Sequence, residues 1–274
     1  MKNCNIALTG LPHSGKTLTC HLLNKLPDVV ALDEPMAPRK LARWKFHVLI
    51  CNRIERFFTK SRESLCTRRT AISRHVSGEV IPKPDEVMRQ GGAKGEIRFD
   101  KALSPNFLLV INHGPGFTAL LETLSKRVPT VAVIRNPLAV LASWNSVPTR
   151  PFLVSSGHAP AAERLDKGLR QTLARLSDRT ERQIHLLSWF FERYRKVLPE
   201  ASILRYEDIV SSEGRALSLI TPYISSLDVA LENRNKERGY DQELLHTLGR
   251  RLLETDGPYW TFYTRESVEQ LLQE

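Results

Sequence analysis

The chain has 274 residues, of which 41% are hydrophobic and 26% charged, and its formal net charge at pH 7 is +10. This composition is typical of a globular protein with a sizeable core, while no apolar stretch approaches the roughly 20 residues of a membrane-spanning helix. The four cysteines show neither disulfide-framework nor metal-site spacing and no signal-peptide pattern opens the chain, so we expect a cytoplasmic protein with reduced thiols.

The first predicted element is a short buried strand at residues 6–8, followed by a glycine-containing loop and a helix at residues 18–26. The phosphate-loop spacing G-x-x-x-x-G-K-[ST] is matched without a mismatch by Gly10, Gly15, Lys16 and Thr17. Such a loop directs backbone N–H groups at one point, and the start of the helix adds the positive end of its dipole. The pattern therefore predicts a phosphate site charged by Lys16, with a plain turn and a solvated lysine as the alternative.

A second strand is predicted at residues 29–32, and it ends in Asp33 and Glu34. Two carboxylates at a strand end near a phosphate loop are well placed for chemistry. Their alternative role is a cap or turn, because Pro35 disfavours helix at Glu34.

The segment from residue 39 to residue 74 is strongly basic, with eleven Lys and Arg residues against two Glu, which gives it a charge of +9. Its apolar residues between Pro38 and Phe58 recur every three or four positions, which predicts an amphipathic helix. A basic block of this kind attracts nucleic acid, an anionic lipid surface, or a polyanionic or phosphorylated substrate. A solvated helix face is the alternative.

The rest of the chain alternates short apolar runs with helical patterns. Residues 77–106 are rich in Gly and Pro and are predicted as a long loop with one short helix at 85–89. Further strands are predicted at residues 107–111, 130–134 and 202–204. Helices are predicted at residues 117–127 and 138–145, twice within 164–198, and over most of 211–274 around a loop at 233–240. Asp178 and Glu181 form a predicted capping box.

These elements predict an α/β fold: a three-layer α/β/α arrangement, like that of the P-loop NTPases, around a central parallel sheet of about five strands. We expect a single domain over residues 1–274, with a basic helical insert at about 36–76 and a Gly/Pro-rich loop at about 77–106. Ligands of such sheets bind at the carboxyl ends of the strands. The phosphate loop, the Asp33–Glu34 pair, His113, Arg135 and Tyr206 all follow predicted strands, so we expect them to share one rim.

Three segments, in this order and separation, resemble the sulfotransferases that use PAPS (3′-phosphoadenosine 5′-phosphosulfate). The loop at residues 10–17, with the Asp33-Glu34-Pro35 turn beyond it, is similar to the family's 5′-phosphosulfate loop and the acidic turn of bacterial members. Residues 133–144 resemble the 3′-phosphate motif, in which an Arg at the strand end (Arg135) and a Ser eight residues later (Ser143) hold the phosphate. Residues 204–209 resemble a recurrent Tyr-Glu-Asp segment that begins here at Tyr206.

The resemblance implies transfer of a sulfuryl group from PAPS to a hydroxyl or amine of a small-molecule or glycan acceptor, with no metal expected. The donor would be bound by Gly10, His13, Ser14, Gly15, Lys16, Thr17, Arg135, Ser143 and Tyr206. Lys16 would neutralise charge on the leaving oxygen. Two residues compete for the role of general base: His113 lies before the Arg135 motif at a separation similar to that of the histidine of many cytosolic sulfotransferases, and Glu34 matches the carboxylate of some bacterial and carbohydrate sulfotransferases.

The sequence also fits two other functions. A P-loop kinase or nucleotidase fits residues 10–17 best and would hold Mg²⁺ with Thr17 and Asp33, but it leaves Arg135, Ser143 and Tyr206 unexplained. A non-enzymatic binder of nucleic acid or another anion would use the basic segment, although no known nucleic-acid-binding motif accompanies it. The basic segment also suggests that the acceptor is acidic or phosphorylated. For the loop at 233–239 we expect one of two positions: closed over the donor's 3′-phosphate, or solvated.

Overall fold

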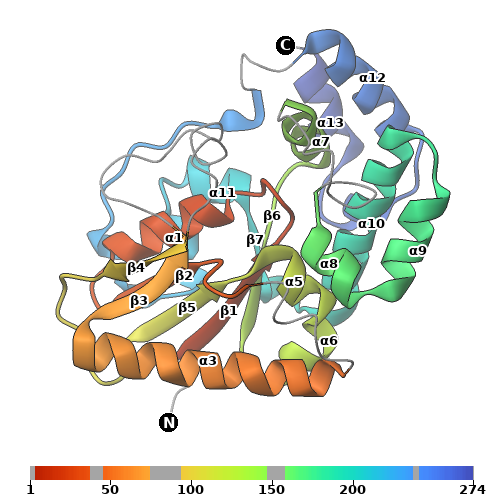
Figure 1. Ribbon diagram of the computed structural model, residues 1–274. Coiled ribbons are helices and arrows are strands. Elements are labelled where there is room, and N and C mark those ends of the chain that lie inside the picture. Colours follow the sequence, from red (N-terminus) through yellow and green to blue (C-terminus); the bar gives the residue numbers. More distant parts are fainter. Residues whose placement is uncertain (1–3, 38–45, 75–93, 147–157, 237–240, 274) are drawn as a thin grey trace.

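A five-stranded parallel sheet lies at the centre of the computed structural model (Figure 1), in the order β2-β5-β1-β6-β7. Its strands are β1 (Asn5–Gly10), β2 (Val29–Asp33), β5 (Leu108–Asn112), β6 (Thr130–Ile134) and β7 (Ile203–Arg205). The structure describes residues 4–37, 46–74, 94–146, 158–236 and 241–273. The predicted α/β class, with about five parallel strands, is confirmed.

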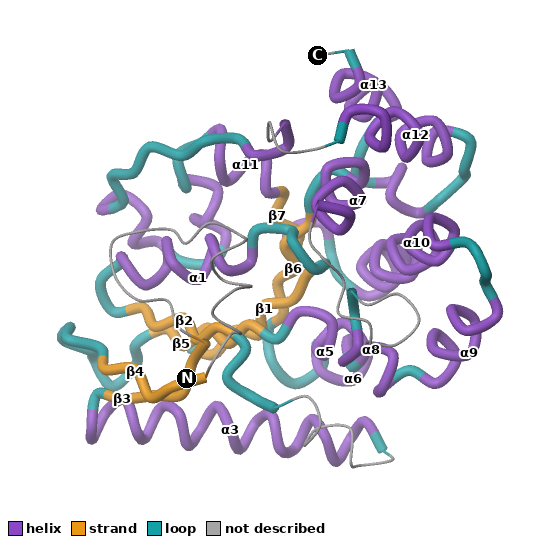
Figure 2. Tube along the Cα trace, turned by 45° about the horizontal axis from the view of Figure 1, so that its top comes forward, coloured by secondary structure: helices purple, strands orange, loops and turns teal. Residues whose placement is uncertain are grey.

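Helices cover both faces of this sheet, because alternate strand residues point to opposite sides. On one face, Leu8 packs with Leu22 and other residues of α1 (Lys16–Lys25). On the other, Ala7 packs with Ile54 and Phe58 of α3 (His47–Arg68), beside α5 (Gly114–Ala119) and α6 (Leu121–Leu124). Figure 2 shows α1 and α3 on opposite sides of the strands.

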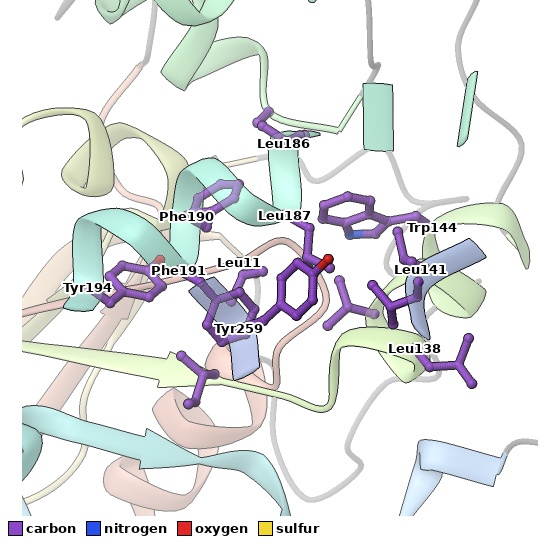
Figure 3. Close-up of a cluster of buried hydrophobic side chains, with 14 of the residues drawn as sticks. Leu11, Leu138, Leu141, Trp144, Leu186, Leu187, Phe190, Phe191, Tyr194 and Tyr259 are labelled. Atoms are coloured by element: carbon purple, nitrogen blue, oxygen red, sulfur yellow. The ribbon is translucent and has the colours of Figure 1, made fainter. Parts of the chain in front are cut away.

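A third apolar cluster lies beyond β6 and is largely helical. It is formed by α7 (Pro137–Ser146), α8 (Pro160–Leu165), α9 (Lys167–Arg175), α10 (Arg179–Val197), α12 (Gln242–Leu253) and α13 (Arg265–Leu272). Figure 3 shows aromatic side chains of α10 with Trp144 of α7 and Leu11 of the phosphate loop. The loop is thus anchored in the core through Leu11.

Two predicted features, the end of the helix in the basic segment and the long loop after that segment, differ from the structure. Helix α3 is described from His47 and runs to Arg68, ten residues beyond the predicted end. Its buried stripe continues through Ser61, a polar residue that interrupts the apolar pattern. The predicted loop at 77–106 contains β4 (Lys94–Arg98), which pairs antiparallel with β3 (Thr70–Arg74). The predicted helix at 85–89 lies outside the described residues.

The region after β7 is less helical than predicted. It contains α11 (Tyr206–Ser211), three 3-10 turns (Arg215–Leu219, Pro222–Ser226 and Arg234–Lys236), then α12, a further turn (Pro258–Thr261) and α13. Another 3-10 turn, Glu200–Ser202, precedes β7. The predicted cap of α10 is confirmed, since the Asp178 carboxylate accepts the Glu181 N–H at 2.7 Å. Among the described residues, no helix is long and apolar enough to cross a membrane.

Candidate functional site

The phosphate loop connects β1 to α1 and requires glycine at two positions. Gly10 has φ 151°, and a Cβ on it would come within 2.3 Å of the Val133 carbonyl oxygen. Gly15 has φ 94°, and a Cβ there would lie 2.7 Å from Cδ2 of Tyr206. Since L residues with a side chain rarely adopt such φ values, both glycines follow from the backbone path of the loop.

The loop is anchored in the hydrophobic core by a hydrogen bond and a buried side chain. The Trp144 indole N–H donates to the Pro12 carbonyl at 3.1 Å, and Leu11 is fully buried. The hydroxyl of Ser14 is buried and has no hydrogen-bond partner among the described residues. A buried donor left without a partner costs about 1–3 kcal/mol, so this hydroxyl favours an acceptor in the loop such as a phosphate oxygen.

Lys16 begins α1 and supplies the charge of the loop from a nearly buried position, with 7% of its surface exposed. Its ammonium donates to the Leu11 carbonyl. Burial lowers the pKa of Lys16 to about 8, although the carboxylates of Glu34 and Asp33 oppose that shift. Lys16 is therefore mostly protonated at pH 7 and titrates just above it.

Asp33 ends β2 and is buried against the loop. Its carboxylate accepts from the Asn112 amide and, at 3.2 Å, from the Thr17 hydroxyl. Burial and the neighbouring charge of Glu34 raise the pKa of Asp33. Thr17 and Asp33, which a P-loop kinase would use to hold Mg²⁺, are therefore in contact.

Glu34 has a left-handed backbone, with φ 42°, and its side chain is 24% exposed. It forms an ion pair with Arg74 at the end of β3. Burial acts to raise the pKa of Glu34, but the surrounding positive charges, that of Arg74 foremost, outweigh it and lower that pKa. Glu34 is therefore an ionised carboxylate at the rim of the site.

His113 follows β5 and is only 2% exposed. Its Nε2 lies 3.2 Å from the Met36 carbonyl oxygen, which can only accept, so Nε2 carries the proton. Its Nδ1 is buried, has no partner among the described residues, and would lie 2.8 Å from a Cβ on Gly116. Burial lowers the pKa of His113 and keeps the ring neutral.

A second cationic group, Arg135, reaches the same loop from the end of β6. Its guanidinium donates to the His13 carbonyl at 3.1 Å, to the Asn235 side chain at 2.7 Å and to the Arg234 carbonyl at 2.5 Å. The guanidinium carbon lies 4.6 Å from the centre of the Tyr206 ring. Arg135 is thus fixed between the phosphate loop and the turn at residues 234–236.

His13 is close enough to both cations for their charges to act on its ring, and it joins the loop to α7. Its Nδ1 is 2.8 Å from the Ser143 hydroxyl. Burial, Lys16 and Arg135 lower the pKa of His13 to about 4, so the ring is neutral at physiological pH. The predicted pair Arg135 and Ser143 therefore meets at His13.

Glu207 holds this second half of the site together. Its carboxylate accepts from the Asn136 N–H at 2.9 Å, the Asn235 amide at 2.7 Å and the Tyr263 hydroxyl at 2.8 Å. Tyr206, one residue earlier, accepts the Arg234 N–H at 3.0 Å. The Tyr-Glu-Asp segment thus positions the partners of Arg135.

The structure brings all the predicted site residues to the carboxyl ends of the strands, in two groups. The first group contains Lys16, Thr17, Asp33, Glu34 and His113, and the second contains His13, Ser143, Arg135 and Tyr206. Sequence reasoning missed Arg74 and Glu207 as members, whereas Asn235 lies in the loop at 233–239, for which the sequence allows either closure over the 3′-phosphate or a solvated position. Glu207 could have been found from its place in the Tyr-Glu-Asp segment, but nothing in the local sequence marks Arg74.

Within the described ranges, no cluster of three or more His, Cys, Asp or Glu side chains could hold a metal ion.

No family model and no curated protein matches the chain. Among solved structures, it is similar to the sulfotransferase domain of the Synechococcus PCC 7002 olefin synthase, with 14% sequence identity and a TM-score of 0.38, over 98% of this chain and 92% of that one. A likeness of this size does not establish a shared function.

Proposed function

We propose that this chain is a sulfotransferase that moves a sulfuryl group from PAPS to a hydroxyl or amine of an acceptor. The observation that carries the proposal is the presence of two cationic groups close to His13: Lys16, at the end of the same loop, and Arg135, which donates to the His13 carbonyl from the end of β6. A donor with anionic groups at both its 5′ and 3′ ends uses both cations. A nucleoside triphosphate carries its phosphates in a single run at the 5′ end and has no 3′-phosphate.

The residues present fit such a donor. For the 5′ end, the loop offers backbone N–H groups at the start of α1, the charge of Lys16 and the Ser14 hydroxyl, which has no partner in the part of the chain that the structure describes. Arg135 has the planar fork that suits phosphate oxygens, and the Ser143 hydroxyl lies within reach of the same loop residue. We assign these two residues to the 3′-phosphate.

The donor supplies an activated sulfuryl group, whose in-line transfer depends mainly on positioning and charge stabilisation, as phosphoryl transfer does. Lys16, protonated at pH 7, stabilises negative charge at the 5′ end. Glu34 is ionised and partly exposed, so it can accept the proton of the incoming hydroxyl or amine. His113 is the weaker candidate for this role, because its Nε2 proton is bound by Met36 and its Nδ1 lies against Gly116.

One observation favours a second candidate, a P-loop kinase that uses Mg²⁺ and ATP. The Thr17 hydroxyl and the Asp33 carboxylate lie 3.2 Å apart, as expected for a pair that shares a magnesium ion or its water. This alternative leaves the Arg135 group without a ligand.

A thermal-shift titration separates the two candidates. We expect PAP (3′-phosphoadenosine 5′-phosphate) to stabilise the protein in the presence of EDTA, and we expect Lys16→Ala and Arg135→Ala to weaken that effect. The matched control is Arg98→Ala, which removes an exposed arginine whose ion-pair partner is Asp100. Stabilisation by Mg-ATP without any response to PAP would overturn the sulfotransferase proposal in favour of the kinase.

A further inference from the structure

The basic segment contains a linear stripe of exposed side chains that the proposed chemistry does not use. Leu49, Arg53, Arg56 and Lys60 follow one another at intervals of three or four residues, so they share one face of α3, and Phe46 is the N-cap residue directly before the helix. Phe46 and Leu49 are 67% and 40% exposed, and the three basic side chains are also exposed. At 1.5 Å per residue the stripe is about 21 Å long.

This face is fixed toward the outside of the molecule. The opposite side of α3 buries Ile50, Ile54 and Phe58 in the core, so the helix cannot rotate to hide the stripe. Figure 1 shows α3 along the lower border of the molecule, and Figure 2 shows it as the outermost layer on its side of the sheet. The stripe therefore lies on the surface of the part of the chain that the structure describes.

The eleven basic residues at positions 39–74 do not all contribute to this exposed surface. Arg62 turns inward and donates to the carbonyls of Phe107 and Cys4, and Arg74 pairs with Glu34. Five are exposed on or directly after α3: Arg53, Arg56, Lys60, Arg68 and Arg69. The other four, Arg39, Lys40, Arg43 and Lys45, lie outside the described residues.

The glutamates of α3 itself offset little of this exposed charge. Of the two glutamates of α3, Glu55 forms an ion pair with Arg127, and Glu63 is exposed. The outer face of the helix is therefore strongly positive, with bare apolar side chains at its amino end.

We propose that this face of α3 docks on an anionic lipid surface. A helix with Lys and Arg on its exposed side and Phe and Leu at one end is suited to the interface, where the apolar groups enter the headgroup layer and the cations attract anionic lipids. Nucleic acid would use the charges but would leave Phe46 and Leu49 exposed. The attachment is peripheral and does not require a spanning helix.

Docking through α3 leaves the candidate site free. The phosphate loop lies at the start of α1, and α1 and α3 cover opposite faces of the sheet (Figure 2). This inference does not rest on the proposed sulfotransferase function, because it uses none of the residues assigned to the donor.

Co-sedimentation with vesicles tests the proposal. We expect the full chain to bind vesicles of phosphatidylcholine containing 30% phosphatidylglycerol, not to bind phosphatidylcholine alone, and to lose affinity as salt is raised. Each basic residue near an anionic leaflet contributes about a factor of five, so R53Q/R56Q/K60Q should bind about 100-fold more weakly. Phe46→Ser combined with Leu49→Ser should also weaken binding, with the salt dependence retained.

The matched control is K167Q/R170Q/R175Q, which removes the same charge from exposed positions of α9 and should bind nearly as the unchanged chain does. Equal losses in the α3 and α9 charge variants would overturn the proposal, because they would show a net-charge effect. Absence of binding to the anionic vesicles at low salt would also overturn it. So would tight binding to a DNA duplex or to poly-glutamate that the Phe46 and Leu49 substitutions leave unchanged, since it would assign α3 to another partner.

Discussion

Because Lys16 loses its proton near neutral pH, its contribution to ligand binding can be measured from the pH dependence of the affinity. Burial lowers the pKa of this lysine to about 8 in the free protein. A group with that pKa is about 90% protonated at pH 7 and about 10% protonated at pH 9. The 3′- and 5′-phosphates of PAP are already ionised over this range, since their second pKa lies near 6.

The affinity for PAP should therefore fall about tenfold between pH 7 and pH 9, because the cation that faces the 5′-phosphate is lost. Lys16→Arg should remove this pH dependence, since an arginine keeps its proton throughout the range. Isothermal titration calorimetry in EDTA at intervals of half a pH unit measures both curves. An affinity that is flat from pH 7 to pH 9 in the unchanged chain, or an equal decline in Lys16→Arg, would refute the assignment of Lys16 to the donor.

Three further predictions concern the loop and its two ends. Arg135→Lys should weaken PAP binding by about 10- to 100-fold and leave the affinity for AMP nearly unchanged, because lysine lacks the planar fork that binds the 3′-phosphate. Calorimetry with both ligands measures the two affinities, and equal losses for PAP and AMP would contradict the prediction. Gly15→Ala should destabilise the fold by about 2–4 kcal/mol in urea unfolding, because of its positive φ and the contact of the new Cβ with Tyr206; a cost below about 1 kcal/mol would argue against the tight turn. Glu34→Gln should lower kcat by about 10²–10⁴-fold with an acceptor that the unchanged chain sulfates, and His113→Gln by much less; the reverse order would make His113 the base.

The sequence predicts the sheet and the rim of the site well, because both depend on local patterns. The run of apolar residues in each parallel strand marks a strand buried on both faces, and the polar residue after it marks the carboxyl end. Asp33, His113 and Arg135 could be placed on one rim in this way without knowledge of their distances.

Partners that are distant in the chain could not be predicted. The ion pair between Glu34 and Arg74 joins residues 40 apart, and the bond between Arg135 and Asn235 joins residues 100 apart. In the sequence, Arg74 is one member of a basic block. The β3–β4 pairing that brings it to Glu34 has no sequence signal, since β4 (Lys-Gly-Glu-Ile-Arg) has no run of apolar residues. No local pattern marks such pairings, which depend on how β3 and the turn at residues 234–236 pack on the rim.

The length of α3 shows a second limit of prediction from the sequence. The apolar pattern ends at Phe58, but the buried stripe continues to Leu65 through Ser61, whose small side chain fits the interface with the sheet. Periodicity reports hydrophobicity rather than burial, so a buried polar residue ends the predicted helix too early.

The most direct test of the central claim, that this loop binds a donor with anionic groups at both ends, compares two ligands that differ only in the 3′-phosphate. Calorimetric titration of the unchanged protein in EDTA should give PAP an affinity about 100-fold higher than that of AMP, since two or more charge-assisted hydrogen bonds are added. Equal affinities for PAP and AMP, or binding of ATP only when Mg²⁺ is present, would contradict the account.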